Sequence, residues 1–387
     1  MSTPPPTDRP LTVMQVLPAL EQGGVERGTL EVSQELRRRG HRSVVVSAGG
    51  HLVERLVEDG TTHLSLDVGK KRPWTLLKAF ALCREILEHS VDLVHVRSRM
   101  PAWVTLAAWR MIPSTKRPRL VTTVHGLNSV NRYSRVMTRG EQVIAVSETC
   151  RQYVLDNYPD VDPKRMTVIH RGVDGAQFPY GYYPSSTWID NWYREYPQLQ
   201  EPFVAVISGR ITRFKGHLDF IEAVDRTLNL GVPVHGLIVG AEDPRRKKYA
   251  ISLREEIARR GLQSHITFTG HRDDIRDVIS VADVVVSTSA DPPESFGRAV
   301  LESVRLGRPT LGYDHGGVGE VLAEVYPEGR VPLHDTAEMA AKMAEVYHGE
   351  LSPPAQTKAF DLQTLLRAEV DLYEKMVHGP GALRRAA

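Results

Sequence analysis

Short runs of consecutive Val, Ile and Leu residues recur along this chain, and segments with helical periodicity lie between them. A strand that is apolar on both faces suits a parallel β-sheet covered by helices on both sides. In the first half, the predicted strands are residues 11–17, 43–47, 93–96, 119–124, 142–146 and 166–169. Gly23 and Gly24 open a predicted helix that runs through Arg39 and is closed by Gly40.

The same alternation begins again near residue 203. The predicted strands of the second half are residues 203–208, 235–239, 266–269, 284–287, 310–313 and 330–332. A length of 387 residues exceeds one typical core and suits two domains. We therefore predict an α/β fold of two doubly wound Rossmann-like domains, residues 10–175 and 202–362, with a cleft between them. Ligands are expected at the carboxyl ends of the strands.

The stretch between these domains, residues 176–201, breaks the alternation. Residues 177–201 contain three prolines, five tyrosines and two tryptophans in weakly periodic sequence. We interpret the stretch as a linker or surface insertion. For its aromatic side chains we favour contact with the neighbouring domain over a sugar platform or a membrane-facing edge.

Charge and cysteine content limit the kinds of partner. The formal net charge is only +2, which does not indicate nucleic-acid binding. The basic runs 37–39, 70–72 and 245–248 are interpreted as solvated helix ends or loops, with attraction to anionic lipid or a phosphorylated acceptor as the alternative. Cys83 and Cys150 form no disulfide framework and no zinc spacing, which fits a reducing cytoplasm.

Membrane attachment is expected to be peripheral at most. No apolar run approaches the ~18 residues of a membrane-spanning helix, and residues 1–10 lack the apolar core of a signal peptide. We expect a cytoplasmic protein, with peripheral contact at the inner face of a membrane left open.

Two glutamates around a Phe-Gly pair are the most informative local feature. Glu294 follows two prolines, which keep it on a loop, whereas Glu302 lies inside a helix predicted to begin near Phe296. Backbone N–H groups at Phe296 and Gly297 would point toward an anion, and Gly297 removes a side chain that would obstruct a phosphate. Two ordinary surface glutamates are the alternative. The pattern suits a sugar joined to a nucleoside diphosphate.

A loop with two cations follows the first strand of the second domain. Residues 209–216 read Gly-Arg-Ile-Thr-Arg-Phe-Lys-Gly, so Arg210 and Lys215 could neutralise a diphosphate. Arg213 competes with Arg210 for this role, and surface positions are the alternative for both. The glycine-rich residues 315–320 also follow a predicted strand, where they permit either a ligand approach or a tight turn.

The first domain carries weaker signals of the same kind. The loop at Gly23 and Gly24 could deliver N–H groups to a phosphate or sugar. His125 ends a predicted strand and could contact a sugar hydroxyl, although a structural histidine is equally expected. Arg97 and Arg99 are candidate anchors for an acceptor, but at most one of them should face the cleft because side chains alternate along a strand.

Several motifs are absent from the sequence. There is no P-loop motif, no GxGxxG after the first strand, no HExxH and no Cys/His metal set. The acidic pair at Asp160 and Asp162 could suggest a metal-bound nucleotide-sugar, but its Pro- and Asp-rich surroundings favour a turn.

Taken together, these residues resemble the GT-B glycosyltransferases of family 4 (group 1), which are retaining nucleotide-sugar enzymes. The resemblance runs from about Val13 to Met376 and is carried by Gly23-Gly24-Val25-Glu26, His125-Gly126, Arg210…Lys215-Gly216 and Glu294-Ser295-Phe296-Gly297…Glu302. Residues 170–174 depart from the family's usual Pro-Asn-Gly-Val-Asp segment. Residues 96–103 and 125–134 are similar to transferases that build lipopolysaccharide core.

This resemblance implies roles for individual residues. The implied catalytic residues are His125, Arg210, Lys215 and Glu294. The implied donor-binding residues are Gly23, Gly24, Gly209, Arg272, Phe296, Gly297 and Glu302. The implied acceptor-binding residues are Arg97, Arg99 and Asn128. The resemblance also implies that no metal or other cofactor is needed, and that a final helix over residues 363–380 packs back on the first domain.

We therefore predict a retaining glycosyltransferase that uses a nucleotide-sugar donor and a glycan, lipopolysaccharide or lipid-linked acceptor. Three alternatives stay open at this point. A GT-B epimerase or phosphorylase would share the donor site, and a nucleotide-sugar sensor would bind without transfer. A dehydrogenase would bind nicotinamide.

Overall fold

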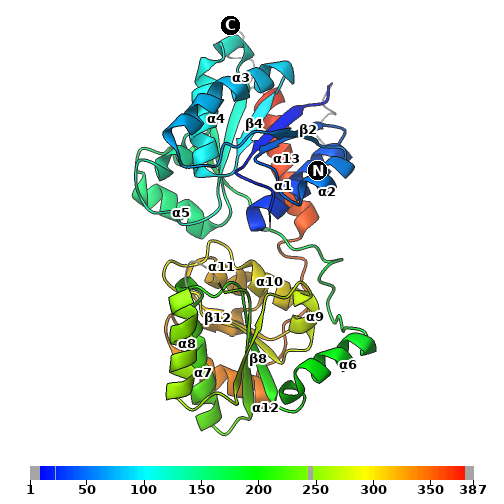
Figure 1. The fold of residues 1–387 in the computed structure, drawn as a ribbon, viewed down its shortest axis with the longest axis vertical. Coiled ribbons are helices and arrows are strands. Elements are labelled where there is room, and N and C mark those ends of the chain that lie inside the picture. The colour runs from blue at the N-terminus through cyan, green and yellow to red at the C-terminus, as the bar shows by residue number, and fades with distance from the viewer. Residues whose placement is uncertain (1–8, 22, 243–246, 380–387) are drawn as a thin grey trace. The chain divides into compact units, whose positions relative to one another are not determined.

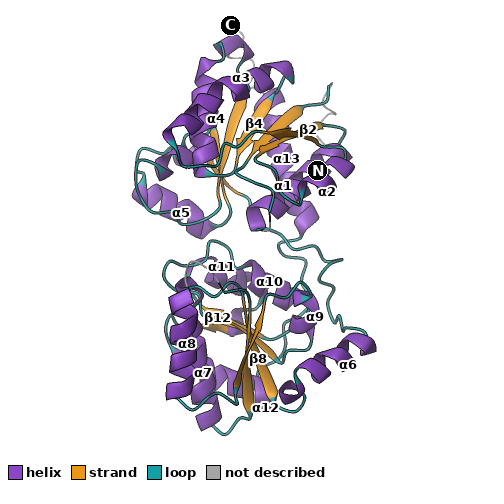
Figure 2. Cartoon of the chain, in the orientation of Figure 1, coloured by secondary structure: helices purple, strands orange, loops and turns teal. Residues whose placement is uncertain are grey.

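The computed structural model describes residues 9–21, 23–242 and 247–379 of the chain. It divides into two compact units, which are coloured along the sequence in Figure 1. Unit 1 comprises residues 1–170 together with 363–387, and unit 2 comprises residues 171–362. Each unit is a parallel sheet with helices on both faces (Figure 2), so the predicted fold of two doubly wound Rossmann-like domains is confirmed.

The sheet of unit 1 has seven strands in the order β3-β2-β1-β4-β5-β6-β7. Its strands are β1 (Thr12–Val16), β2 (Arg42–Ser47), β3 (Thr62–Ser65), β4 (Leu93–Val96), β5 (Arg119–Val124), β6 (Gln142–Ala145) and β7 (Met166–Val168). All neighbours pair in parallel, with Val13 opposite Ser43 on one side and Leu93 on the other. The strand order reverses between β1 and β4, so the loops after these strands lead to opposite faces of the sheet.

Two helical layers cover this sheet. The helices of unit 1 are α1 (Gly24–Arg38), α2 (Val53–Glu58), α3 (Lys78–Glu88), α4 (Arg99–Met111), α5 (Glu148–Asn157) and α13 (Leu362–His378). Along β4, Val94 and Val96 join the core formed with α3 and α4, whereas His95 points to the other face and contacts Tyr373 of α13. The chain therefore needs its last helix to complete the fold of its first unit.

A buried polar network fixes α13 against the sheet of unit 1. The Arg97 guanidinium donates through Nε to Gln15 Oε1 at 2.8 Å and through Nη2 to Glu369 Oε1 at 2.8 Å. The Tyr373 hydroxyl donates to the same Glu369 oxygen at 2.6 Å. Because all four side chains are buried, each group depends on the others for its hydrogen bonds.

The sheet of unit 2 has six strands in the order β10-β9-β8-β11-β12-β13. Its strands are β8 (Phe203–Ser208), β9 (Val234–Val239), β10 (Ile266–Gly270), β11 (Val284–Ser287), β12 (Thr310–Tyr313) and β13 (Arg330–Val331). The strand order reverses between β8 and β11, which pair with Ala205 opposite Val284. This reversal places the loops that follow β8 and β11 beside the same crevice.

The helices of unit 2 also form two layers. They are α6 (Ser186–Glu195), α7 (His217–Asn229), α8 (Lys247–Arg259), α9 (Ile275–Ser280), α10 (Arg298–Arg305), α11 (Gly316–Val325) and α12 (Thr336–His348). Ala205 and Ile207 of β8 join the core with α7, α8 and α12, and Val204 and Val206 face the layer that contains α6 and α9. The short 3-10 helices of the chain include η1 (Pro73–Leu77), η5 (Pro197–Leu199) and η6 (Arg213–Lys215).

The aromatic residues between the predicted domains belong to unit 2. Trp192 of α6 and Leu199 are buried against Val204 and Leu237, and the Trp188 ring stacks on Trp192 at 5.2 Å between centroids. Most aromatic side chains of this stretch therefore pack on the domain that follows them, as favoured above, whereas Tyr183 is 61% exposed.

Candidate active site

Two loops that meet at the strand reversal of unit 2 carry Lys215 and Glu294. Lys215 belongs to η6, between β8 and α7, and Glu294 belongs to the loop between β11 and α10. Because β8 and β11 are neighbours and their following helices cover opposite faces, the two loops diverge and leave room between them. Ligands bind at this position in open α/β sheets, so Lys215 and Glu294 lie where a ligand is expected.

Glycine conformation and close approach shape the Lys215 loop. Gly209 and Gly216 have φ values of 136° and 66°, which L-residues with a side chain rarely adopt. A Cβ atom on Gly216 would lie 1.9 Å from the carbonyl oxygen of Thr288. In turn, the Thr288 hydroxyl donates to the carbonyl oxygens of Lys215 and Gly216 at 3.1 and 2.8 Å. The loop after β8 is thus fixed against the loop after β11.

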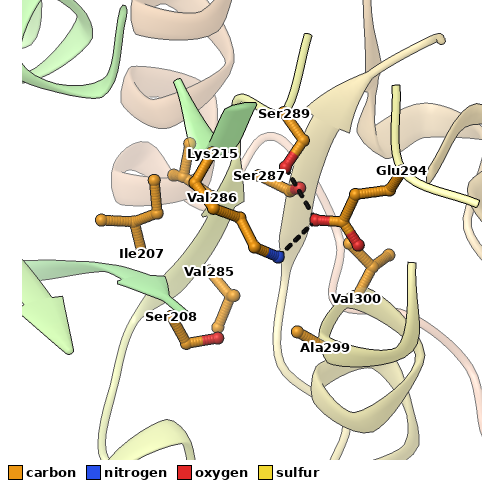
Figure 3. A pocket seen from close by; sticks show the side chains of 10 residues that line it. All are labelled: Ile207, Ser208, Lys215, Val285, Val286, Ser287, Ser289, Glu294, Ala299 and Val300. Atoms are coloured by element: carbon orange, nitrogen blue, oxygen red, sulfur yellow. Dashed lines mark hydrogen bonds and ion pairs between the residues drawn. The ribbon is translucent and has the colours of Figure 1, made fainter. Parts of the chain in front are cut away.

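The fixed loops bring the Lys215 ammonium onto the Glu294 carboxylate (Figure 3). Lys215 Nζ lies 2.5 Å from Glu294 Oε1, and the Ser289 hydroxyl donates to the same oxygen at 2.7 Å. Both charged side chains keep about a quarter of their surface exposed, 25% for Lys215 and 23% for Glu294. An incoming ligand can therefore reach the pair.

A small pocket, with a cavity volume of about 10 Å³ or room for one water molecule, lies at this pair (Figure 3). Its lining comes from β8, β11, α10 and the two loops, and comprises Ile207, Ser208, Lys215, Val285, Val286, Ser287, Ser289, Glu294, Ala299 and Val300. The lining combines five apolar side chains with three serine hydroxyls and the charged pair. Such a lining strengthens the charge interaction because it excludes part of the water.

Glu294 is held in its charged form. Burial by itself would raise the pKa of this carboxyl, but the Lys215 charge and the hydrogen bonds from Lys215 and Ser289 lower the pKa below its usual value of 4.5. The carboxylate can accept hydrogen bonds from sugar hydroxyls, and the Lys215 ammonium can turn to an anion that enters the pocket. The sequence interpretation missed Ser289. A serine close after an apolar strand and five residues before Glu294 was the available signal.

Phe296 and Gly297 set the geometry of the segment between the glutamates. The Phe296 ring is 4% exposed and meets Phe360 edge to face at 5.5 Å, so it anchors the loop in the core. Gly297 caps α10 with a φ of 87°, and a Cβ atom there would lie 3.1 Å from the Val318 Cα. The helix therefore begins at Arg298, two residues later than predicted, because Gly297 is in the left-handed region.

The glycine-rich start of α11 holds the Glu294 loop from the other side. The Gly317 N–H donates to the Glu294 carbonyl oxygen at 2.8 Å. A Cβ atom on Gly317 would lie only 2.3 Å from the backbone of Phe296. Residues 315–317 therefore hold the Glu294 loop in place and also turn the chain.

Glu302 lies inside α10, as predicted. It is 9% exposed, and the Arg298 Nε donates to its Oε1 at 3.0 Å. This i,i+4 pair directs the carboxylate toward the first turn of the helix. The sequence interpretation did not include Arg298, although its spacing from Glu302 identifies it as a partner.

Arg210, Arg213 and Arg272 are the other candidate cations of unit 2, and they differ in their contacts. Arg210 is exposed directly after β8, whereas the Arg213 guanidinium lies 5.4 Å above the centre of the Tyr249 ring. Both arginines are exposed, and the contact with Tyr249 holds Arg213 against unit 2. Arg272 is engaged by Asp274 at 2.6 Å and by Glu195 at 3.3 Å, and the Asp274 hydrogen bonds raise its pKa. It connects α6 to the rest of unit 2.

In unit 1, Gly24 and Gly126 border open space. A Cβ atom on Gly24 would meet nothing within 4 Å, and the same holds for Gly126 after β5. Gly23 precedes α1 in extended conformation, and His125 is half-buried at the end of β5. Backbone at Gly24 and Gly126 is therefore uncrowded, whereas a Cβ atom on Gly23 would lie 2.4 Å from Glu26 Oε2.

The predicted acceptor residues of unit 1 differ in exposure. Arg97 is buried in the α13 network, so its guanidinium is not available to an acceptor. Arg99 opens α4, donates to Ser134 Oγ at 3.2 Å and lies 5.4 Å from the centre of the Tyr133 ring. Asn128 is half-buried, and its amide donates to the Gly126 carbonyl oxygen at 3.3 Å. Of the two arginines, Arg99 therefore remains the candidate.

The acidic pair near residue 160 has a structural role. Asp162 accepts from the Lys164 N–H at 2.9 Å and caps a short 3-10 helix, and Asp160 pairs with Arg135. This confirms the predicted turn. Within the described ranges, no group of three or more His, Cys, Asp or Glu residues is placed to hold a metal ion. No helix in the described part of the chain has the length and apolarity needed to cross a membrane.

Several solved structures share this architecture. The chain is similar to a glycosyltransferase from Rickettsia africae, with 28% identity and a TM-score of 0.83 over 95% of this chain and 99% of that one. HepE from Anabaena, solved with UDP and glucose, aligns with 19% identity and a TM-score of 0.78 over 94% of this chain and 100% of its own. WaaG, a glycosyltransferase involved in lipopolysaccharide biosynthesis, aligns with 16% identity and a TM-score of 0.65 over 93% and 99% of the two chains. The fold is that of the GT-B glycosyltransferases.

Family models match both units. The model of Glycosyltransferase Family 4 matches residues 22–177, and the model of Glycosyl transferases group 1 matches residues 189–359. Together they span most of the chain, which therefore belongs to the group 1 glycosyltransferases of family 4.

Proposed function

We propose that this chain transfers a sugar from a nucleoside-diphosphate sugar to a hydroxyl of a glycan or glycolipid, with retention of the anomeric configuration. The Lys215–Glu294 pair carries the proposal, because it places a cation and a hydroxyl-accepting carboxylate 2.5 Å apart at the strand reversal of unit 2. A diphosphate needs the first group and a sugar needs the second. The pair is partly exposed, so both can be reached.

In the proposed reaction, Lys215 and Arg210 bind the diphosphate, and Glu294 accepts hydrogen bonds from the sugar. The bond between the anomeric carbon and the diphosphate oxygen breaks first and leaves a sugar with oxocarbenium character. The acceptor hydroxyl attacks from the same face, and its proton passes to the departing diphosphate. No side chain is required as a base, and Glu294 is not assigned as the nucleophile.

The charge that develops on the leaving group is neutralised by the protein in this proposal. Arg210 offers two parallel N–H donors and Lys215 a mobile point charge. The first backbone N–H groups of α10 add a partial positive charge. We therefore propose that transfer needs no metal, and that it continues in the presence of EDTA.

The remaining predicted residues have secondary roles in the proposal. Glu302 would bind the ribose hydroxyls, with Arg298 holding its carboxylate in place. Gly24 would let the backbone approach the diphosphate, and His125 would contact the sugar near the reacting carbon. Arg99 and Asn128 are the acceptor candidates of unit 1.

The donor and acceptor are proposed by similarity. UDP and glucose are present in the HepE structure, so a UDP-sugar is the first donor to test. Two segments of the sequence and the WaaG fold favour a lipopolysaccharide core or other surface glycan as acceptor. A cytoplasmic location with peripheral membrane contact completes the proposal.

A nucleotide panel tests the proposal directly. Thermal unfolding of the purified chain is measured with UDP, GDP, ADP and their glucose derivatives, and one family of ligands should raise the unfolding temperature most. The stabilising nucleotide-sugar is then incubated with and without acceptor glycans, and transfer is followed by mass spectrometry.

The outcomes separate the proposal from its alternatives. Acceptor-dependent transfer with retained configuration supports it. Epimerised sugar or free UDP formed rapidly from donor alone indicates an epimerase, and a requirement for phosphate indicates a phosphorylase. Binding without transfer to any acceptor indicates a sensor.

A further inference from the structure

Four large apolar side chains are exposed within a stretch of seven residues in unit 1. Trp74, Leu76 and Leu77 of η1 are 60%, 43% and 66% exposed, and Phe80 of α3 is 65% exposed. Single exposed apolar residues are common on soluble proteins, but a concentration of this kind marks a site of interaction.

The opposite side of the same segment is firmly held in the core. Thr75, Ala79, Leu82 and Ile86 are buried, and their spacing of four, three and four residues follows one face of a helix. α3 packs against α4 on this inner face (Figure 1). The segment is therefore apolar on both sides, and among the described residues of unit 1 only its inner side is buried.

Positive charge directly precedes the exposed apolar residues. Lys70, Lys71 and Arg72 are all exposed, and residues 67–84 contain five cations and one acid. The acid is Asp67, which pairs with Lys70 at 2.6 Å. The Arg72 guanidinium lies 5.7 Å from the centre of the Trp74 ring, so charge and aromatic surface are adjacent in space.

We propose that this basic–aromatic surface, residues 70–80, docks unit 1 on an anionic lipid bilayer. Trp prefers the boundary between lipid headgroups and acyl chains, and Leu and Phe enter the acyl region beneath it. Lys and Arg are attracted by acidic headgroups, each contributing about fivefold in affinity. A bilayer fits this pattern because its acidic headgroups supply negative charge for residues 70–72 and its acyl chains supply an apolar layer for residues 74–80.

The surface adjoins the acceptor candidates of the same unit. The Tyr133 ring contacts both the Lys71 ammonium at 5.6 Å and the Arg99 guanidinium at 5.4 Å. Val130, in the loop that leads to Tyr133, is 50% exposed. A lipid-linked acceptor would thus arrive at the edge of the unit that carries Arg99. This extension rests on the proposed function, whereas the bilayer contact itself does not.

Vesicle sedimentation tests the contact. The full-length chain is mixed with vesicles of phosphatidylcholine alone or with about a third phosphatidylglycerol, and the bound fraction is measured at low and high salt. Binding is expected to need the anionic lipid and to weaken as salt rises. The K70Q/K71Q/R72Q variant should bind about a hundredfold more weakly, from about fivefold per cation. The W74A/L77A/F80A variant should lose at least tenfold.

Matched variants control for charge and exposed area. K164Q/K358Q/K375Q removes three exposed cations outside the basic runs of the sequence, and L230A/I251A removes two apolar side chains that are 57% and 53% exposed in unit 2. Both controls should sediment like the wild type. The fluorescence of Trp74 should shift to shorter wavelength on the vesicles, and W74F should lose that shift.

Several outcomes overturn the inference. The inference fails if the wild-type protein does not bind anionic vesicles, or if W74A/L77A/F80A binds them as well as the wild type does. It also fails if W74A/L77A/F80A changes the oligomeric state and leaves vesicle binding unchanged. The unfolding-temperature shift with the nucleotide-sugar is measured on every variant. Wild-type protein that binds vesicles without any such shift refutes the proposed function and leaves the lipid contact standing.

Discussion

Replacing Lys215 by Met tests the central pair of the candidate site. Methionine keeps most of the length of the side chain, so the apolar contacts with the pocket persist and only the ammonium is lost. The change removes one of the two donors to Glu294 Oε1 and leaves Ser289 alone. It therefore separates the charge of Lys215 from its volume.

The expected loss of activity follows from the charge on the leaving group. If Lys215 neutralises the departing diphosphate, its removal raises the activation free energy by about 3 kcal/mol, which is more than a hundredfold in turnover. Turnover is measured with saturating donor, so that weaker donor binding does not contribute. Lys164→Met, at an exposed position of unit 1, is the control and should behave like the wild type.

The same variant has an expected effect on stability. The pair is about one-quarter exposed, between a surface pair and a buried one, so its loss should cost about 2 kcal/mol, or roughly 4–8 °C in unfolding temperature. Since the folded-state pKa of Glu294 lies below 4.5, this contribution is fully present above about pH 4.5. It is lost as the pH falls through the lower, folded-state pKa.

Thermal unfolding of wild type and Lys215→Met at pH 7 and in steps below pH 4.5 measures this dependence. The difference between the two proteins should be largest at pH 7 and should shrink in acid. Near-normal turnover of the variant at saturating donor would remove Lys215 from the proposed role. An unfolding-temperature difference that stays constant with pH would refute the electrostatic account of the pair.

Three further substitutions have definite expected outcomes. Gly216→Ala should lower the free energy of unfolding, measured by denaturant titration, by more than ~2 kcal/mol, because its Cβ would collide with the Thr288 carbonyl. Gly231 also has a positive φ, 84°, but open space around it, so Gly231→Ala should cost only ~1 kcal/mol in the same assay. Glu302→Gln should weaken binding of UDP about tenfold and binding of 2′,3′-dideoxy-UDP much less in calorimetry; an equal loss for both nucleotides would contradict the ribose role. Arg97→Met should destabilise the protein by about 3–5 kcal/mol without changing the nucleotide affinity, because it leaves the Glu369 carboxylate buried with the Tyr373 hydroxyl but without its arginine. A stability close to that of the wild type would refute this account of the network.

Much of the sheet structure could be predicted because its signal is local. The strands β4, β5, β8, β11 and β12 have the predicted bounds, since most of the residues in each are β-branched, aromatic or leucine. The strand β3 was not predicted, because Thr62–Ser65 is short and three of its four residues are polar. Helix α10 was placed two residues early because only the backbone shows that Gly297 is left-handed.

The candidate site was predictable only in part. Glu294 and Lys215 were identifiable because each follows an apolar strand next to glycine or proline, and strand ends meet in a parallel sheet. Their direct contact spans 79 residues of sequence, and nothing in the spacing predicts the distance between the two side chains. Arg97 shows the opposite problem: its partner Glu369 lies 272 residues away, so an arginine that the structure buries was considered as an acceptor contact.

The distance between Arg97 and Glu369 has a consequence for biosynthesis. The cation of the first unit is made long before its buried counter-charge, and at about 5–20 residues per second the interval is about 15–50 s. During that time the ribosome produces all of residues 171–362, so unit 2 is complete in sequence before unit 1 is. On the nascent chain, the second unit can therefore mature first, and the amino-terminal sheet waits as an unfinished, chaperone-accessible surface until the last helix is synthesised.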